Sequence, residues 1–565
     1  MKTSFYAPYL TLTILYLNIM SVTEAQTAIN INPDPSGEPW FVSNITDEQI
    51  EDSWANVSEY KSPKRALKSS KTLPSRINNS EHKYFRTIFN QSGGCCSQAS
   101  GIGYVFTYEI SLKRDIDVKN NDNWMHRYPT HFTWNFLNGG YGGGSYFPEG
   151  WLINMDHGTP TTETYGGGMN PLGATAWMNG YDKWYKALKN KCITGYSKIY
   201  LNSEEGVENT KKWLHNHNRT SDTYGGIASF YGKMTGISIE KIPAGEYEAG
   251  KSVVTAWGTS GGHAMTIVGY DDNVKWDFNA DGQYTNDIDI NNDGIVNGLD
   301  WESGAWIIAN SWGENWQDSG FAYVPYKVLW HPNKFAGIIE VTEKYEPKAV
   351  MKVKITYSKR NQIKFKVGIS ESTNATSPSI TKEFKKSFNN RAGEYPLCGE
   401  NNTNTLEVGL DLTELMEGID ATETCKFFFQ AITKEQHDPA VGEIEEVSVI
   451  MYPNKKETFS PERSVYLPHN STTTVSVGVK GTPPTSIPSI SNPELCRIQP
   501  GLNGIGVSIM QGDYPVDVNI FNVAGMLVKT MKLHPGNHYI PMDNGLYILR
   551  AKRNNEYISH KVAVY

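Results

Sequence analysis

The chain has 565 residues, of which 39% are hydrophobic and 12% aromatic, and its formal net charge is -8. This length exceeds what one hydrophobic core usually organises, and the composition supports packed domains rather than disorder, so we expect two or three domains. The modest charge and the lack of a long basic run give no indication of nucleic-acid binding.

Residues 1–25 have the pattern of a cleaved signal peptide for export. Lys2 precedes an apolar stretch over residues 6–20, and Thr23 and Ala25 occupy the two small-residue positions of a cleavage site. A membrane anchor is the alternative, but hydroxyl residues interrupt the stretch and it is short for a bilayer span. No later segment is long and apolar enough, so we expect no transmembrane segment in the mature chain.

Residues 26–72 form a polar segment ahead of the first domain. A helix is predicted over residues 47–54, and a stretch rich in lysine and serine ends at Lys71. This composition suits either a cleavable pro-segment or a solvated lead-in.

Residues 73–345 mix helical and strand patterns and are rich in glycine, tryptophan and tyrosine. Apolar spacing predicts helices over residues 99–109 and 204–217 and a strand over residues 264–269. We therefore expect an α+β domain.

The second half of the chain has the short alternating runs of β-domains. Residues 346–480 predict an all-β sandwich, because strand-like runs alternate with turns that contain asparagine, glycine and proline. The proline-rich residues 481–497 predict a linker, and residues 498–565 form another compact set of strands.

The six cysteines are too few for a disulfide-built scaffold, although an exported protein can form disulfides. Cys398 and Cys425 are the pair that we expect to form a staple. Adjacent cysteines rarely bond to each other, so Cys95 and Cys96 leave at least one free thiol.

Cys96 lies just ahead of the helix predicted over residues 99–109. A thiol at a helix N-terminus lies at the positive end of the dipole, which favours the nucleophilic thiolate. Five residues earlier, Gln91 carries a side-chain amide that can donate to a developing oxyanion, and the backbone N–H of Cys96 can supply a second donor. Taken alone, this pattern is more often simple packing.

Two later residues complete a catalytic pattern. His263 stands at the head of an apolar strand, and Asn310 follows the end of another. The asparagine amide oxygen can accept a hydrogen bond from the imidazole and so orient it as a base. Cysteine, histidine and asparagine then occur in the chain order of the papain arrangement.

Residues 73–344 resemble the papain-like cysteine peptidases. The resemblance is carried by the residues that open the domain, surround the nucleophile, follow the histidine and form the asparagine motif: Leu73, Pro74, Gln91, Cys96, Ser100, His263, Gly269, Asn310, Ser311, Trp312, Gly313, Trp316, Gly320 and Phe321. It implies a two-subdomain catalytic domain and assigns Gly142, Gly143 and Gly144, together with Trp312, to substrate binding. The fold class that we expect is thus α+β, with all-β sandwich domains after the catalytic domain.

The sequence departs from that family around the nucleophile. Ser97 stands where the family usually has an aromatic residue, one residue is missing between Gln91 and the nucleophile relative to the family, and the disulfide that anchors this loop is absent. Either Cys95 or Cys96 can therefore be the nucleophile. Cys96 is favoured because it places Ser100 where the family has a serine in the same helix.

An acidic insertion between His263 and Asn310 resembles the calcium loops of dockerins and EF-hands. Its second half has oxygen ligands at the first, third, fifth and twelfth positions, a glycine at the sixth and Ile295 at the seventh: Asp289, Asn291, Asp293 and Asp300. Its first half repeats the opening pattern as Asp277, Asn279, Asp281 and Gln283, but has Ile288 at the twelfth position, so Asp287 or Asp289 is needed instead. A structural Ca²⁺ is expected; an acidic turn-rich loop is the alternative.

Residues 498–565 resemble the C-terminal sorting domain of the type IX secretion system. The matching segments are residues 518–528, 545–549 and 561–564. The resemblance implies export across both membranes, with the secretion machinery as a partner and a secreted or cell-surface location. An ordinary accessory β-sandwich is the alternative.

The sequence as a whole predicts a secreted thiol protease that hydrolyses polypeptide substrates, with no organic cofactor. The alternative is a cell-surface binding protein that keeps the peptidase fold without activity. The sequence leaves open the substrate side-chain preference, the choice between endo- and exopeptidase action, and the role of the middle β-domain.

Overall fold

The structure is a computed structural model that describes residues 28–30, 41–43, 46–60, 73–219, 222–416, 424–434, 437–479, 496–501, 504–509, 515–522, 527–543, 545–553 and 556–564. The predicted signal peptide and most of the predicted linker lie outside these residues. None of the helices in the described ranges has both the length and the apolar character needed to span a bilayer.

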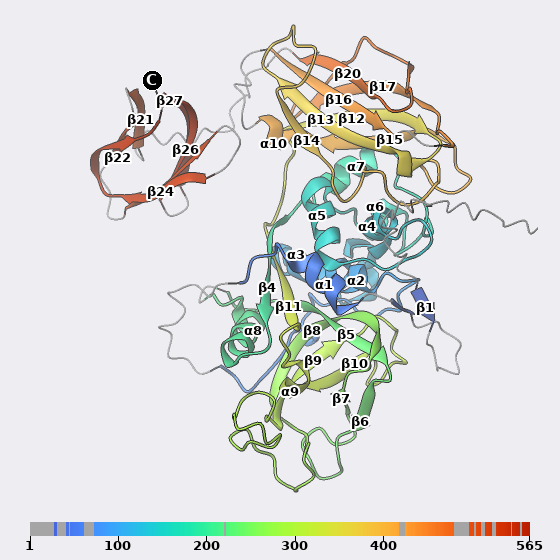
Figure 1. The fold of residues 1–565 in the computed structure, drawn as a ribbon, viewed down its shortest axis with the longest axis vertical. Helices are drawn as coiled ribbons and strands as arrows, with labels where there is room; N and C mark the ends of the chain where they lie inside the picture. Colours follow the sequence, from blue (N-terminus) through green and yellow to red (C-terminus); the bar gives the residue numbers. More distant parts are fainter. Residues whose placement is uncertain are drawn as a thin grey trace, which may run out of the picture.

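Most helices lie in the first half of the chain (Figure 1). The described α-helices are α1 (Asp47–Trp54), α2 (Cys96–Gln98), α3 (Thr107–Arg114), α4 (Thr130–Leu137), α5 (Phe147–His157), α6 (Thr162–Tyr165), α7 (Tyr181–Leu188), α8 (Glu204–Asn216), α9 (Tyr326–Leu329) and α10 (Thr413–Met416). The π-helical stretch η3 (Ala99–Phe106) joins α2 to α3, and short 3-10 turns are η2 (Asn79–Glu81), η4 (Asn121–His126) and η5 (Arg360–Gln362).

Local sequence signals explain two of the helices that were predicted. In α1, Thr46 and Gln49 form a capping box that satisfies the first backbone N–H groups, while Trp54 is buried at the other end. In α8, the side chain of Ser203 caps the N-terminus by accepting from Gly206. Both helices agree with the predicted ranges to within one residue.

An eleven-stranded sheet packs against this helical region, with the main strand order β4-β11-β5-β8-β9-β10-β7-β6. Its strands are β1 (Ala28–Asn30), β2 (Phe41–Ser43), β3 (Arg76–Asn78), β4 (Ile193–Tyr200), β5 (Ala228–Thr235), β6 (Ser238–Lys241), β7 (Ser252–Ala256), β8 (Ser260–Lys275), β9 (Ser303–Ala309), β10 (Phe321–Pro325) and β11 (Phe335–Val341). The long β8 pairs with β5 on one side and β9 on the other, and β2 and β3 also pair with it. This strand therefore organises the sheet.

Two antiparallel sheets form the middle β-domain. One contains β12 (Ala349–Tyr357), β15 (Leu406–Asp411), β17 (Gly442–Met451), β18 (Lys456–Phe459) and β19 (Val465–Tyr466); the other contains β13 (Ile363–Ser370), β14 (Ile380–Glu383), β16 (Cys425–Thr433) and β20 (Thr472–Val479). Buried and half-buried positions alternate along most of β12, as expected of a strand with one face on a core. The α+β fold class with a following β-sandwich is confirmed.

The C-terminal residues form a separate seven-stranded sheet with its own hydrophobic core. Its strands are β21 (Cys496–Gly501), β22 (Gly504–Ile509), β23 (Val516–Asn522), β24 (Leu527–Leu533), β25 (Gly536–Pro541), β26 (Gly545–Arg553) and β27 (Glu556–Val564). The strands predicted in the last part of the chain thus form, and β23, β26 and β27 pair in sequence.

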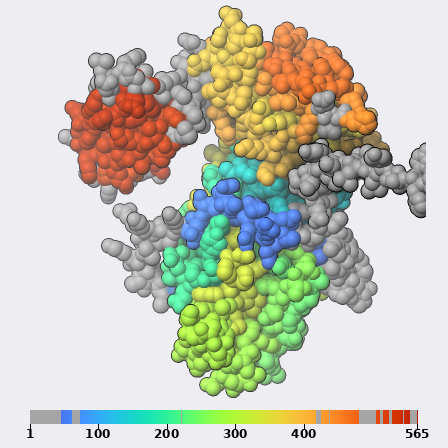
Figure 2. Space-filling view, in the orientation of Figure 1, coloured from blue at the N-terminus to red at the C-terminus, as the bar shows by residue number. Residues whose placement is uncertain are grey.

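The helical region and the middle β-sandwich share one continuous hydrophobic core. Phe388 of the sandwich is 1% exposed and packs its ring 5.3 Å from those of Phe136 and Trp177 and 5.7 Å from that of Trp184. Figure 2 shows the sandwich, in yellow and orange, lying directly on the teal helical region. The sandwich is therefore part of the same packed unit rather than a tethered module.

Polar contacts across this boundary are buried as well. His157 at the end of α5 lies 2.8 Å from the hydroxyl of Ser387, and Lys191 forms an ion pair of 2.8 Å with Asp411, whose side chain is fully buried. An ion pair away from water depends on close geometry, so these contacts fix the relative position of the two regions.

The predicted staple between Cys398 and Cys425 is wrong. Both thiols are free and lie buried in the shared core. The thiols of Cys95, Cys96 and Cys192, outside that core, are also free and buried. Apolar packing, which needs no covalent link, holds the sandwich around the two cysteines.

Replacing Phe388 by alanine should destabilise the helical region and the sandwich together. Removing a buried phenylalanine ring usually costs about 3–5 kcal/mol. Phe459→Ala, at a ring that is 45% exposed, is the matched control and should change little. We expect Phe388→Ala to lower one common unfolding transition in circular dichroism and tryptophan fluorescence; two separate transitions, only one of them shifted, would contradict the shared core.

Candidate active site

The two adjacent cysteines open the helical run that continues through α2, η3 and α3. Cys95 is the N-cap residue, because its carbonyl accepts the N–H groups of Gln98 and Ala99 at 2.9 and 2.8 Å. The first-turn Cys96 therefore lies at the positive end of the helix, where a thiolate is stabilised. It is 1% exposed in this structure.

The side chains of the two cysteines point into different surroundings. The thiol of Cys95 lies 3.8 Å from the hydroxyl of Thr130 on α4, within the helical region. The thiol of Cys96 instead receives a hydrogen bond from the backbone of Ala264 on β8, directly beside His263. Only Cys96 therefore lies next to the histidine strand.

Ser100 anchors the same helical run to β8 one turn later. Its hydroxyl lies 2.8 Å from the carbonyl oxygen of Met265 and 2.8 Å from the hydroxyls of Ser229 and Thr266. These contacts hold the helix that carries Cys96 at a constant position on the sheet.

His263 and Asn310 meet because β8 and β9 are antiparallel neighbours. The register pairs Thr266 with Ala309, which brings Asn310, just past the end of β9, beside His263. The distance between His263 Nε2 and Asn310 Oδ1 is 2.7 Å. His263 Nδ1 is buried and has no hydrogen-bond partner among the described residues.

This hydrogen bond defines the tautomer that the network favours. If Nε2 carries the proton and donates to Asn310, then Nδ1 is left with a free lone pair, which is the form that a general base needs. The Trp312 ring lies with its centroid 4.2 Å from that of His263 and covers this pair from one side. Asn310 Oδ1 also accepts from the N–H of Ser311 at 2.7 Å, so its orientation is held twice.

Burial favours the neutral forms of His263 and Cys96. Burial lowers the pKa of His263 to about 4, although the hydrogen bond to Asn310 opposes the shift. Burial raises the pKa of the Cys96 thiol, opposed by hydrogen bonds from the backbone of Ala264 and Ser97. Burial also raises the pKa of Cys95, to about 12, so this thiol is poorly suited to become a nucleophile.

Gln91 is tied to the asparagine loop. Its Oε1 accepts from the hydroxyl of Ser311 at 2.7 Å, and its backbone N–H donates to the Ser311 carbonyl at 2.7 Å. Its Nε2 donates to the carbonyl oxygen of Gly93 at 2.8 Å, three residues before Cys96. The structure thus brings Gln91, Cys96, His263 and Asn310 into one neighbourhood.

The glycine-rich loop with Gly142, Gly143 and Gly144 reaches the same neighbourhood. The hydroxyl of Ser97 donates to the carbonyl of Ser145 at 2.5 Å, which ties the loop to the helix that carries Cys96. The carbonyl of Gly143, however, already accepts from Trp134 Nε1 at 2.8 Å. This carbonyl therefore has a lone pair committed to the protein, which restricts what it can offer a substrate.

The N-terminal segment lies against the histidine strand. Ser43 of β2 pairs with Gly262, one residue before His263. Asp47 at the start of α1 forms an ion pair of 2.6 Å with Lys233 on β5, and Trp54 packs its ring 5.8 Å from that of Trp151. Residues 41–43 and 46–54 are thus docked on the domain formed by residues 73–345, close to the candidate base.

The predicted calcium loop is organised by its own side chains. Asp289 accepts hydrogen bonds from the backbone N–H groups of Asp293 and Gly294 at 3.3 and 2.8 Å, and Asn291 accepts from Asp293 at 2.8 Å. Asp300, at the twelfth position, is fully buried and accepts from three backbone N–H groups of the loop at 2.9–3.3 Å.

The loop that begins at Asp277 repeats this pattern and reveals a residue that sequence reasoning missed. Its first, third and fifth positions accept backbone N–H groups as in the second loop. Its twelfth residue is Ile288, but Glu302, which is 1% exposed, accepts from the second and ninth positions at 2.8 and 3.1 Å. Glu302, rather than Asp287, therefore closes this loop as Asp300 closes the other.

The described residues contain no group of three or more histidine, cysteine, aspartate or glutamate side chains arranged to hold a metal ion. Asp300 and Glu302 both direct their carboxylates to backbone N–H groups. The oxygen-rich donor set has the chemistry that Ca²⁺ prefers, but calcium binding stays a prediction.

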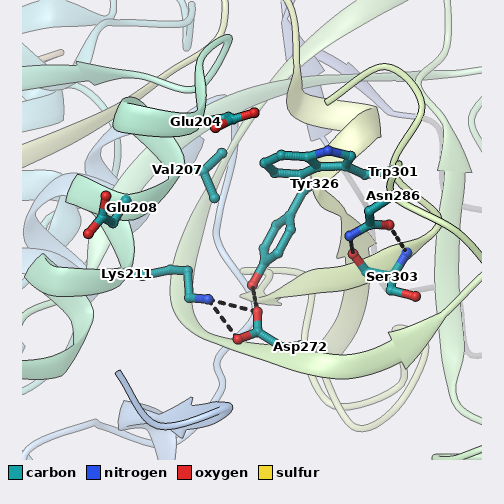
Figure 3. Close-up of a pocket in the computed structure, with 9 residues that line it drawn as sticks. All are labelled: Glu204, Val207, Glu208, Lys211, Asp272, Asn286, Trp301, Ser303 and Tyr326. Atoms are coloured by element: carbon teal, nitrogen blue, oxygen red, sulfur yellow. Dashed lines mark hydrogen bonds and ion pairs between the residues drawn. The ribbon is translucent and has the colours of Figure 1, made fainter. Parts of the chain in front are cut away.

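A hollow lies beside the acidic insertion, and none of the four candidate catalytic residues lines it (Figure 3). It is lined by residues of α8 and β8, by residues between β8 and β9 that include Trp301, and by the first residues of β9 and α9. Its central charges are already paired, because Lys211 and the hydroxyl of Tyr326 both bind Asp272 at 2.7 Å. We assign no chemistry to this hollow.

Comparisons with known proteins give structural likeness only. No family model matches the chain, and no curated protein matches it significantly. Solved structures that it resembles include xylellain, a cysteine protease from Xylella fastidiosa, with 16% identity, coverage of 51% of this chain and 92% of that one, and a TM-score of 0.31.

Two further likenesses are to plant proteins. The proform of the ragweed pollen allergen Amb a 11, a cysteine protease, is 14% identical, with 53% of this chain and 77% of that chain covered and a TM-score of 0.31. A recombinant stem bromelain precursor is 14% identical over 52% of this chain and 80% of its own, also with a TM-score of 0.31. Likenesses of this size do not establish an activity.

The buried neutral His263 should make the protein less stable in acid. Its pKa of about 4 in the folded state lies below the value of about 6.5 in an unfolded chain, so unfolding takes up a proton between these two pH values. Stability should therefore fall as the pH drops through this window, by on the order of 3 kcal/mol for this group.

Denaturant unfolding at several pH values between 7 and 4 tests this expectation. His263→Gln should reduce the slope of the free energy of unfolding against pH by the amount that corresponds to about one proton, whereas Cys95→Ala should leave that slope unchanged. Equal slopes for His263→Gln and the unchanged protein would contradict a buried neutral imidazole.

Proposed function

We propose that the chain is a papain-like cysteine peptidase that hydrolyses peptide bonds through a thioester, with Cys96 as nucleophile. The single observation that carries the proposal is the pair formed by His263 and Asn310: Nε2 is bound at 2.7 Å and Nδ1 is left without a partner among the described residues. The position of the Cys96 thiol beside Ala264 supports it.

The chemistry follows from these positions. Once the Cys96 proton has passed to His263 Nδ1, the thiolate sulfur attacks the carbonyl carbon of the scissile bond, and the carbonyl oxygen becomes an oxyanion. Gln91 Nε2 and the backbone N–H of Cys96 stabilise that oxygen. Protonated His263 then donates to the leaving amine nitrogen, the carbon–nitrogen bond breaks, and a thioester remains.

Water completes the reaction. His263, again neutral, takes a proton from a water molecule that attacks the thioester carbon. The carbon–sulfur bond breaks, the acid product leaves, and the thiol is restored with the proton held by the imidazole. Asn310 takes no proton; its amide oxygen keeps the ring aligned throughout.

The docked N-terminal segment favours a pro-segment over a solvated lead-in. It pairs with β8 beside His263, and burial keeps both reacting groups neutral. Release of residues 26–72 would restore water to the site and so favour the charged thiolate and imidazolium. A protein that is secreted or held at the cell surface, with residues 498–565 as a type IX sorting domain, completes the proposal.

The rival function is a surface binding protein with an inactive peptidase fold. Reaction with an epoxide inhibitor that alkylates activated thiols separates the two. After removal of residues 26–72, the protein should be labelled at Cys96, and Cys96→Ala should abolish labelling and peptide hydrolysis.

Cys95→Ala is the matched control for this experiment. It removes a neighbouring thiol of equal size that faces Thr130, so it should keep most of the activity. The reverse ranking would identify Cys95 as the nucleophile, and a folded protein that never labels at either cysteine would favour the binding function. Circular dichroism of each variant confirms that the fold is intact.

We also propose a structural role for Ca²⁺ in the insertion between β8 and β9. Asp289, Asn291, Asp293, Ile295 and Asp300 would hold one ion, and Asp277, Asn279, Asp281, Gln283 and Glu302 would hold a second. The ion would order the ends of the two strands that carry His263 and Asn310, and no step of hydrolysis involves it.

Calcium should raise the melting temperature, because an ion that binds only the folded state at 100 times its dissociation constant stabilises it by about 3 kcal/mol. Asp293→Asn keeps the acceptor for Ile295 N–H but removes a charge, so it should weaken only the calcium-dependent shift. The exposed Asp182→Asn on α7 is the control. A melting temperature that neither calcium nor a chelator changes would rule out the metal.

A further inference from the structure

A cavity of about 660 Å³ lies where the glycine-rich loop meets the β-sandwich. One wall comes from the peptidase-like region, from the end of α4 to the start of α5. The other wall comes from the sandwich and consists of Asn361, Asn389, Asn390, Arg391, Ala392, Gly393 and Lys434. The sandwich therefore shapes a hollow that the peptidase-like region does not form alone.

This cavity adjoins the candidate catalytic site. Gly143, Gly144 and Tyr146 line it, and the carbonyl of the intervening Ser145 accepts the hydrogen bond from Ser97, the residue after Cys96. Gln98 of the same helix donates to the carbonyl of Tyr146 at 3.0 Å. A polypeptide that lies along the glycine-rich loop from the nucleophile would therefore reach the cavity.

The wall from the sandwich is held firmly in place. A Cβ atom on Gly140 would lie 2.7 Å from the carbonyl oxygen of Ala392, so only glycine permits this backbone approach. Arg360, which is fully buried, donates to the Ala392 carbonyl at 2.7 Å and stacks its guanidinium 4.7 Å from the ring of Trp177. The cavity is thus preformed rather than assembled by a mobile loop.

Among the described residues, the lining carries an excess of positive charge. Arg391 and Lys434 are its described cations, and Glu149 is the one carboxylate among the described lining residues. Glu149 is already engaged: Oε1 lies 2.9 Å from Lys386 Nζ and 3.7 Å from Arg391, and Oε2 accepts from the N–H of Tyr146 at 3.3 Å. One carboxylate shared by two cations leaves the cavity suited to an added negative charge.

We propose that the β-sandwich forms one wall of the substrate cleft and that this cavity receives an acidic side chain of the bound polypeptide, held by Arg391 and Lys434. The inference rests on the proposed peptidase function and adds its substrate preference. It gives the middle β-domain a direct role in substrate binding.

Peptides that differ only by glutamate or glutamine at successive positions N-terminal to the scissile bond test the proposal. At one position, glutamate should be favoured in kcat/KM by about fivefold, the size expected for a partly exposed ion pair, mainly through KM. Arg391→Ala with Lys434→Ala should remove this preference but keep kcat for a short peptide that ends before the cavity.

Lys456→Ala, on β18 and away from the cavity, is the matched control and should keep the preference. A second measurement does not need turnover: the Cys96→Ala protein, after removal of residues 26–72, should bind the glutamate peptide about fivefold more tightly than the glutamine peptide in fluorescence anisotropy. Equal binding of the two peptides, or a preference that survives the double substitution, would overturn the inference. Preferential binding of the glutamate peptide, together with no peptide hydrolysis by the protein that keeps Cys96, would refute only the peptidase function.

Discussion

The antiparallel pairing of β8 with β9 is the constraint on which the candidate site depends. The register places Asn310 beside His263 although 46 residues separate them, including the acidic insertion. Ala264 of the same strand contacts the Cys96 thiol, and Met265 accepts the hydrogen bond from Ser100. A single strand therefore carries the candidate base, supports the candidate nucleophile and positions the residue proposed to orient the base.

The insertion closes its loops with residues next to β9. Asp300 and Glu302 end the acidic segment, and each gathers backbone N–H groups from one of the two loops before Ser303 starts β9. The order of the loops is thereby linked to the start of the strand that leads to Asn310. A structural ion bound in these loops would therefore influence the position of Asn310 through β9, without contact with the candidate catalytic residues.

The shared aromatic core makes the sandwich part of the same packed unit as the candidate site. Phe388 packs among rings from the helical region, and Arg360 reaches from the sandwich to the carbonyl of Thr175. Because packed interiors resist rearrangement, the sandwich loop that contains Arg391 keeps its place beside the glycine-rich loop. Stability and the proposed substrate preference therefore depend on the same interface.

The sequence by itself determined the local elements and pointed to the candidate reacting groups. The helix predicted over residues 47–54 forms as α1, where Thr46 and Gln49 cap it, and alternation predicts β12, because such signals act over a few residues. The order of Cys96, His263 and Asn310 indicated the chemistry, because each residue type has a distinct role in acyl transfer.

Only the tertiary structure decided what depends on distant parts of the chain. Contacts with α4 and β8 set the directions of the Cys95 and Cys96 side chains. Glu302 accepts hydrogen bonds from a loop that starts 25 residues earlier, at Asp277. Packing of the core leaves the thiols of Cys398 and Cys425 free. The cavity between the glycine-rich loop and Arg391 likewise joins segments that no local pattern connects. Such contacts arise from long-range packing, which short-range periodicity and capping do not encode.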